Sequence, residues 1–258
     1  MRGSISGQTT SRILPAPHAS PPSPALPAIK GFLETSFLDW PGRLCAVVFL
    51  GGCNFRCPFC HNHPLVLAPE GIETIPADHV LGRLAAMGPW LGGICVSGGE
   101  PTLSPGLAEL LAVFKTTGLP VKLDTNGTRP EVLEELLAAG LVAMIAMDVK
   151  APLDQPGYDA CAGTRVDLAA IDRSIELIKK SGLPHQFRMT VVPGLHDEAA
   201  VEAWGAFLAG SPLKLQNFNP RTTLNPDVLP AQGFTPAAFA ALQKLAAGAG
   251  AGVAAIPK

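Results

Sequence analysis

The chain has 258 residues, of which 47% are hydrophobic and only 16% are charged, and its formal net charge is -2. This length suits one large domain, since α/β barrels often run to about 200–250 residues as a single unit. The near-neutral balance gives no basic field that would favour nucleic acid or an anionic membrane as a partner. No apolar run in the sequence approaches the roughly 20 residues that a membrane span needs, so we expect a soluble, cytoplasmic protein.

Residues 1–28 are rich in Pro, Ser and Ala and contain no acidic residue. Such a segment buries too little apolar surface to offset the entropy of ordering it. Its two arginines faintly suggest a transit peptide, but the repeated prolines interrupt an amphipathic helix. We therefore expect a disordered tail over residues 1–28, followed by one domain over residues 29–258.

From residue 29 onward, apolar runs alternate with segments of helical spacing. The expected strands are 44–50, 94–97, 121–124, 143–149, 186–192 and 213–218, with a short edge strand at 253–256. The expected helices are 76–87, 105–117, 130–139, 168–180, 198–209 and 236–246. Alternating β and α elements imply a parallel sheet with right-handed crossovers, either an open doubly wound sheet or a partial barrel. Because polar motifs follow all six strands and would converge at one rim, we predict an α/β partial (βα)6 barrel with helices outside.

Three cysteines, Cys53, Cys57 and Cys60, follow the first expected strand at spacing C-x3-C-x2-C. Thiolates suit zinc or iron–sulfur clusters. A structural zinc site or a closed cluster wants four protein ligands, and this segment offers three. The trio therefore indicates a [4Fe–4S] cube held at three irons, with the fourth iron open to a substrate or cofactor. A zinc knuckle closed by His61, His63 or a distant cysteine is the alternative.

The other three cysteines carry no predicted chemistry. Cys45 and Cys95 lie in apolar runs and are interpreted as small buried hydrophobic residues. Cys161 is expected in a loop without a nearby partner, and we assign it no role.

The motifs taken together resemble those of a known family. The cysteine trio with Phe59 before its last member, followed by Gly-Gly-Glu-Pro at 98–101, resembles the radical S-adenosylmethionine (SAM) superfamily. More narrowly, residues 39–43, 51–57, 60–62, 124–127 and 148–150 resemble the activating enzymes of glycyl-radical enzymes. The most similar of these are the activating proteins of anaerobic ribonucleoside-triphosphate reductase, and the resemblance covers residues 31–220.

The resemblance implies an oxidoreductase that holds a [4Fe–4S] cluster on the three cysteines and reductively cleaves SAM to a 5′-deoxyadenosyl radical. It implies a glycyl-radical enzyme as partner, an anaerobic ribonucleotide reductase in the nearest relatives. It also implies a low-potential electron donor such as flavodoxin or ferredoxin, and allows a monovalent cation. A partner loop must enter the barrel mouth, so we expect an exposed apolar rim there. The alternatives are a radical SAM enzyme acting on a small molecule, such as a deazaguanine-forming synthase, and a non-catalytic iron–sulfur or zinc protein.

The resemblance also suggests which residues contact the cofactor. It places Lys150 near the SAM carboxylate and Asp148 near the ribose or a bound cation, with Asp124 and Thr125 in the same polar cluster. Asp148 and Lys150 are two apart on one expected strand, so both should point to the same face. A buried Asp and Lys are costly unless paired or used, and a purely structural pair is the alternative.

The loop at 98–101 is expected to face the cofactor. Gly98 and Gly99 lack a Cβ, which lets backbone approach a ligand closely. Glu100, before Pro101, is expected to accept a charge-assisted hydrogen bond from the cofactor ammonium. The remaining candidates for cofactor contact are Phe59, Asn126, Arg188, Thr190, Gln216, Asn219 and Arg221. The alternatives are simple core filling for Phe59, a plain turn for Asn126 and a solvated rim for the last three.

Overall fold

The computed structural model describes residues 25–249, which form one seven-stranded sheet in the order β1-β2-β3-β4-β5-β6-β7. The strands are β1 (Ile29–Ser36), β2 (Cys45–Leu50), β3 (Gly93–Gly98), β4 (Val121–Thr125), β5 (Met144–Asp148), β6 (His185–Val191) and β7 (Leu213–Asn217). Strand β1 is antiparallel to β2, and β2 to β7 are parallel. The predicted α/β class with six parallel strands is therefore confirmed. Most of the expected disordered tail (residues 1–24) and the expected strand at 253–256 lie outside the described residues.

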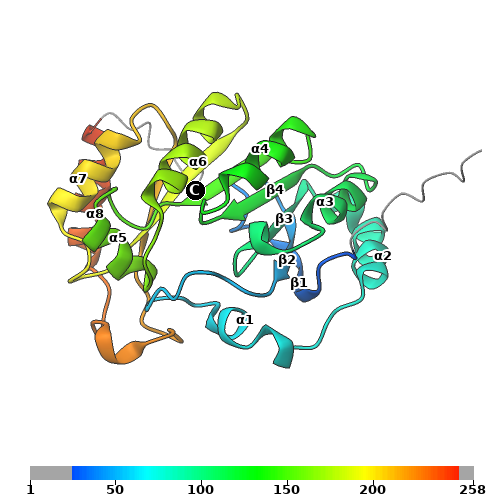
Figure 1. Cartoon of the computed structure of the whole chain (residues 1–258), viewed down its shortest axis with the longest axis horizontal. Coiled ribbons are helices and arrows are strands. Elements are labelled where there is room, and N and C mark those ends of the chain that lie inside the picture. The colour runs from blue at the N-terminus through cyan, green and yellow to red at the C-terminus, as the bar shows by residue number, and fades with distance from the viewer. Residues whose placement is uncertain (1–24, 250–258) are drawn as a thin grey trace, which may run out of the picture.

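Helices connect the parallel strands and lie along the outer face of the sheet (Figure 1). The α-helices are α1 (His63–Leu67), α2 (Ala77–Met87), α3 (Leu107–Lys115), α4 (Pro130–Ala138), α5 (Gln155–Ala162), α6 (Leu168–Lys180), α7 (Glu198–Phe207) and α8 (Pro236–Gly248). Short 3-10 helices are η1 (Pro69–Gly71), η2 (Gly88–Trp90), η3 (Pro101–Leu103) and η4 (Pro226–Val228). All six helices expected from the sequence are present. None of the helices within residues 25–249 is long and apolar enough to cross a bilayer.

Strand β1, helices α1 and α5 and the 3-10 helices were not expected from the sequence. Strand β1 mixes apolar residues with the half-buried charged residues Lys30 and Glu34, so it lacks the continuous apolar run of the buried strands. Helix α5 begins after Asp154, whose side chain accepts from the Gly157 backbone N–H, and it buries Tyr158 and Cys161. The prediction that Cys161 lies in a loop without a partner is wrong, because its Sγ is buried in α5 at 3.5 Å from His196 Nε2.

The two faces of the strands bury different sets of side chains. In β2, Ala46 and Val48 belong to the main core beneath the helices, whereas Cys45 and Val47 belong to a small inner cluster with Cys95. Both cysteines are 0% exposed, which confirms them as buried hydrophobic residues. Trp40 belongs to the same cluster and lies against Gly93, where β3 begins. The inner face is therefore filled at the amino ends of the strands, and its polar residues lie further along them.

Candidate functional site

The cysteine loop, residues 51–62, follows the carboxyl end of β2 and is held by backbone hydrogen bonds from three directions. These bonds are Gly52 N to Leu65 O at 2.7 Å, Arg56 N to Ala162 O at 2.7 Å and Asn225 N to Pro58 O at 3.0 Å. They come from α1, from the end of α5 and from the segment after β7, the last of which approaches the cysteine loop in Figure 1. The Phe59 ring packs in the main core, and Asn62 Nδ2 donates to Gly98 O at 2.8 Å. The loop is therefore fixed by the protein itself.

The three thiols lie in a partly dry environment, and one positive charge, the Lys150 ammonium, acts on all of them. Cys57 is buried, and Cys53 and Cys60 are half-buried. Burial raises the pKa of all three thiols, that of Cys57 to about 12, while the Lys150 ammonium acts in the opposite direction on each. Cys53 Sγ also accepts from Phe55 N at 3.3 Å. Metal ions or iron–sulfur clusters, which bind thiolates, would find three ligands here.

The donor set consists of three thiols, and iron–sulfur clusters are held by cysteine thiolates. Among residues 25–249, no group of three or more His, Cys, Asp or Glu side chains is placed to hold one metal ion. The thiolates of a [4Fe–4S] cube bind different irons, so they do not need to converge on one point. Three thiols on one fixed loop beside a lysine therefore fit such a cluster.

Gly98 and Gly99 bring the next loop against the cysteine loop. Gly98 has a φ of +123°, and a Cβ on it would lie 2.2 Å from Leu50 O; a Cβ on Gly99 would lie 1.8 Å from Gly52 O. Gly99 N donates to Leu50 O at 2.9 Å, and Glu100 N donates to Gly52 O at 2.8 Å. The glycines were expected to make room for a ligand. The structure shows that they make room for the backbone that leads into Cys53.

Glu100 is held by protein donors. It is 1% exposed, and its Oε1 accepts from Thr102 N at 3.1 Å, Thr102 Oγ1 at 2.5 Å and Thr125 Oγ1 at 2.8 Å, whereas its Oε2 accepts only from Asn126 N at 2.6 Å. Burial raises the pKa of Glu100, and these donors act against that rise. An ionised carboxylate oxygen has two acceptor sites, so Oε2 keeps one site, and the contact with a cofactor ammonium stays a prediction. The residue also joins the loop after β3, where Pro101 begins η3, to the loop after β4.

A chain of alternating charges, which we call the interior charge chain, crosses the inner face of the sheet. It consists of Lys122, Asp124, Arg188, Asp148 and Lys150. The Lys122 ammonium contacts the Asp124 carboxylate. Arg188 donates from Nη1 to Asp124 at 2.9 Å and from Nε to Asp148 at 2.7 Å, and Lys150 Nζ lies 3.2 Å from Asp148. Arg188 on β6 thus reaches Asp124 on β4 across β5 and contacts Asp148 of β5 on the way.

The charges of this chain stabilise one another. Burial disfavours ionised Asp148, but Arg188 and Lys150 outweigh that cost and hold the pKa of Asp148 below its usual range. Burial likewise disfavours the Lys150 ammonium, but Asp148 raises its pKa above the ordinary value. The chain therefore presents a protonated lysine at the rim, next to the cysteine loop.

Of the predicted polar cluster, Asp124, Asp148 and Lys150 are thus brought together. Thr125 was expected with them, but its Oγ1 donates to Glu100 at 2.8 Å, because neighbouring residues of a strand point to opposite faces. Two further differences concern Lys150 and Arg188. Strand β5 ends at Asp148, so Lys150 lies beyond it and not on the same strand. Arg188 was expected to reach the cofactor, but its guanidinium lies between the two aspartates. Lys122, which is 1% exposed, was not singled out. The available signal was a lysine within an apolar strand, two residues before Asp124 and so on the same face.

The other predicted residues divide into two groups. Asn126 lies beside the cysteine loop, where its Nδ2 donates to Asn54 Oδ1 at 2.9 Å and lies 3.8 Å from Cys53 Sγ. Thr190 is half-buried on β6. Asn219 is exposed, and its Oδ1 accepts from Arg221 N at 3.0 Å in a local turn after β7. Gln216 and Arg221 are exposed as well, as the solvated-rim alternative predicted.

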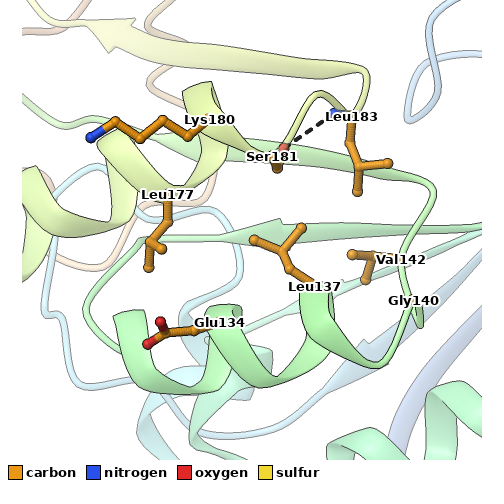
Figure 2. A pocket seen from close by; sticks show the side chains of 8 residues that line it. All are labelled: Glu134, Leu137, Gly140, Val142, Leu177, Lys180, Ser181 and Leu183. Carbon is orange, nitrogen blue, oxygen red and sulfur yellow. Dashed lines mark hydrogen bonds between the residues drawn. The ribbon is translucent and has the colours of Figure 1, made fainter.

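An apolar surface groove lies elsewhere. It runs between α4 and α6, where Leu137, Leu177 and Val142 face one another (Figure 2). Val142 lies two residues before β5, so the groove is at the amino end of the strands, whereas the cysteine loop is at the carboxyl end. We do not assign the chemistry to it.

Comparison with known proteins agrees with this site. A profile of the radical SAM superfamily matches residues 47–203. A protein of Methanocaldococcus jannaschii, named provisionally as a glycyl-radical enzyme activating enzyme, is 36% identical over 179 residues, which are 67% of this chain and 72% of the relative. The pyruvate formate-lyase-activating enzyme of Clostridium pasteurianum is 30% identical over 165 residues, 62% of this chain and 66% of the relative. Other radical SAM enzymes are also among the relatives.

A solved structure supports the fold. Streptococcus suis SuiB bound to S-adenosylmethionine superposes with a TM-score of 0.58 at 17% identity, over 75% of this chain and 44% of SuiB. At that identity the likeness concerns the fold alone.

Proposed function

Because this chain belongs to the radical SAM superfamily, and is similar to activating enzymes within it, we propose that it generates a glycyl radical on a partner enzyme. We propose an anaerobic ribonucleoside-triphosphate reductase as that partner, and the cytoplasm as the place of reaction. The superfamily uses a [4Fe–4S] cluster and SAM, which when bound supply the one-electron cleavage that yields a 5′-deoxyadenosyl radical. The observation that carries the proposal is the fixed loop of three thiols beside the protonated Lys150.

In this proposal each residue has a defined task. Cys53, Cys57 and Cys60 hold the cluster, and the Lys150 ammonium binds the SAM carboxylate. Glu100 positions the loops on either side of the cluster through its four protein donors. The position between Asp124 and Asp148 is taken by a guanidinium, so the proposal includes no monovalent cation.

Exposed apolar side chains next to the cysteine loop support a protein partner. Leu67 at the end of α1 is 52% exposed, and Val228 in η4 is 63% exposed. Both belong to segments that hydrogen-bond the cysteine loop, α1 at Gly52 and the η4 segment at Pro58. Large exposed apolar residues beside a reactive site favour contact with another chain.

A radical SAM enzyme acting on a small molecule is the second candidate. The interior charge chain favours it, because charged side chains suit a polar substrate enclosed by the barrel. A non-catalytic role is no longer supported, since the named relatives are enzymes.

The test is anaerobic. The reconstituted protein, SAM and a reductant (reduced flavodoxin, reduced ferredoxin or dithionite) are incubated with candidate glycyl-radical enzymes, and the glycyl radical is observed by electron paramagnetic resonance. We expect a signal on an anaerobic ribonucleotide reductase with the wild type and none with Cys57→Ala. SAM cleavage without a radical on any glycyl-radical enzyme would favour the small-molecule candidate.

A further inference from the structure

A buried histidine lies directly behind Lys150. His196 belongs to the turn between β6 and α7 and is 3% exposed. Its Nε2 lies 2.7 Å from Lys150 O, and Val192 N donates to its Nδ1 at 3.1 Å. Cys161 Sγ of α5 lies 3.5 Å from the same Nε2. None of these contacts was expected from the sequence.

The partners fix the protonation of the ring. A backbone N–H can only donate, so Nδ1 accepts and carries no proton. A carbonyl can only accept, so Nε2 carries the proton and donates it to Lys150 O. Burial lowers the pKa of His196, in agreement with a neutral ring. The imidazole therefore has one tautomer, and both nitrogens are used.

This ring connects Lys150 to the helix that holds the cysteine loop. Lys150 has left β5, so its carbonyl is outside the strand ladder and His196 supplies its donor. On the other side of the ring, α5 ends at Ala162, whose carbonyl accepts from Arg56 N at 2.7 Å. Gly163 follows with a φ of +65°, and a Cβ there would lie 2.1 Å from Arg56 O. His196 thus lies between the backbone of Lys150 and the support of the cysteine loop.

We propose that His196 is a positioning residue that sets where the Lys150 ammonium lies relative to the three thiols. Asp148 orients the ammonium from the side-chain end, at 3.2 Å, and His196 fixes the same residue at its backbone. The proposal rests on the proposed function, in which Lys150 binds the SAM carboxylate. His196 does not touch the cofactor, so its effect is on cofactor binding through Lys150.

Two amide substitutions separate positioning from filling of space. In His196→Gln the side-chain amide reaches the place of Nε2 and keeps a donor for Lys150 O. In His196→Asn the amide reaches only the place of Nδ1, so the bond to Lys150 O is lost. His185 is the matched control, since it lies at the opposite end of β6 with its ring nitrogens 3.0 Å from Leu183 O and 3.3 Å from Ser211 Oγ.

The experiment measures SAM affinity of the reconstituted proteins by anaerobic calorimetry, with iron content and circular dichroism recorded for each. We expect His196→Asn to bind SAM about 10-fold more weakly at unchanged iron content, the factor that one buried hydrogen bond is typically worth. We expect His196→Gln to recover most of that loss and His185→Asn to bind as the wild type does. Equal affinity of His196→Asn and wild type, or an equal loss in His185→Asn, would overturn the proposal.

A second readout uses the protein without cluster or SAM. In long-range 15N NMR spectra, we expect His196 as the Nε2–H tautomer from about pH 8 down to below its ordinary pKa of 6.5. An Nδ1–H tautomer, or a ring that titrates near 6.5, would overturn the proposal. A wild type that shows the expected tautomer and binds no SAM would instead refute the proposed function, so the two failures are distinguishable.

Discussion

Replacing Glu100 with Gln separates a structural role of this residue from a cofactor contact. The carboxylate accepts from two backbone N–H groups, Thr102 N on Oε1 and Asn126 N on Oε2. A glutamine has one oxygen and one NH2 group. In either orientation its NH2 group therefore faces a backbone N–H, and one buried donor is left without a partner.

The cost follows from that single orphan donor. An unsatisfied buried donor costs about 1–3 kcal/mol, and 1 kcal/mol lowers the Tm of a domain of roughly this size by about 2–4 °C. We therefore expect Glu100→Gln to lower the Tm of the protein without cluster or SAM by about 4–8 °C for a loss of about 2 kcal/mol. Glu100→Ala removes all four contacts and is expected to cost more.

The assay is thermal unfolding by circular dichroism, combined with SAM binding after reconstitution. Glu34→Gln is the control, because Glu34 is an exposed carboxylate paired with Arg83 at 2.7 Å, and its loss should leave the Tm nearly unchanged. The reasoning is refuted if Glu100→Gln unfolds with the wild type while its SAM affinity falls sharply. That result would support a direct contact of Glu100 with the cofactor ammonium.

Three further predictions concern the packing, charge and titration of the site. In Gly99→Ala the new Cβ would lie 1.8 Å from a backbone oxygen of the cysteine loop, so the iron content after reconstitution should fall. Gly82→Ala is the control, because a Cβ on Gly82 in α2 would have no neighbour within 4 Å, and its iron content should be unchanged. Equal iron content in the two variants would contradict the close approach. Lys122→Met should lower the free energy of unfolding in urea by about 2 kcal/mol. This is less than the roughly 3–5 kcal/mol of a fully broken buried pair, because Asp124 keeps its guanidinium partner. The double variant with Asp124→Asn should lose less than the sum of the two single losses. The pKa of His196 in the folded protein is below 6.5, so as the pH falls through 6.5 the unfolded chain gains a proton first. The free energy of unfolding then declines by at most about 1.4 kcal/mol per pH unit. His196→Gln should flatten this slope between about pH 7.5 and 5.5, and an unchanged slope would assign it to other groups.

The architecture was predictable because buried parallel strands leave an unambiguous trace. Continuous apolar runs followed by helical spacing gave all six parallel strands and the helices between them, with ends that differ by about one or two residues. Strand β1 left no such trace, because charged and polar residues interrupt its apolar ones and the strand is specified by its pairing with β2. Helix α5 contains Pro156 and Gly157, which indicate a turn when read locally.

The site was predictable as far as its chemistry lies in local motifs. Thiols at ligand spacing and polar residues after strands identified the rim, but the partners of each side chain depend on the curvature of the sheet. A charge-assisted contact with the cofactor ammonium was expected for Glu100, but nothing in the local motif indicates the four donors that the loops after β3 and β4 supply. His196 shows the same limit. It is a single histidine after Pro-Gly in the segment that follows β6, and nothing in that segment indicates that its ring contacts the Lys150 carbonyl after β5.

The most direct test of the account is the amount of 5′-deoxyadenosine released from SAM by the anaerobically reconstituted, dithionite-reduced protein. We expect the wild type, with about four irons per chain, to release it, and folded Cys57→Ser to release none. A wild type that binds one zinc and leaves SAM intact, or a Cys57→Ser variant that cleaves as well as the wild type, would contradict a cluster held by these three thiols.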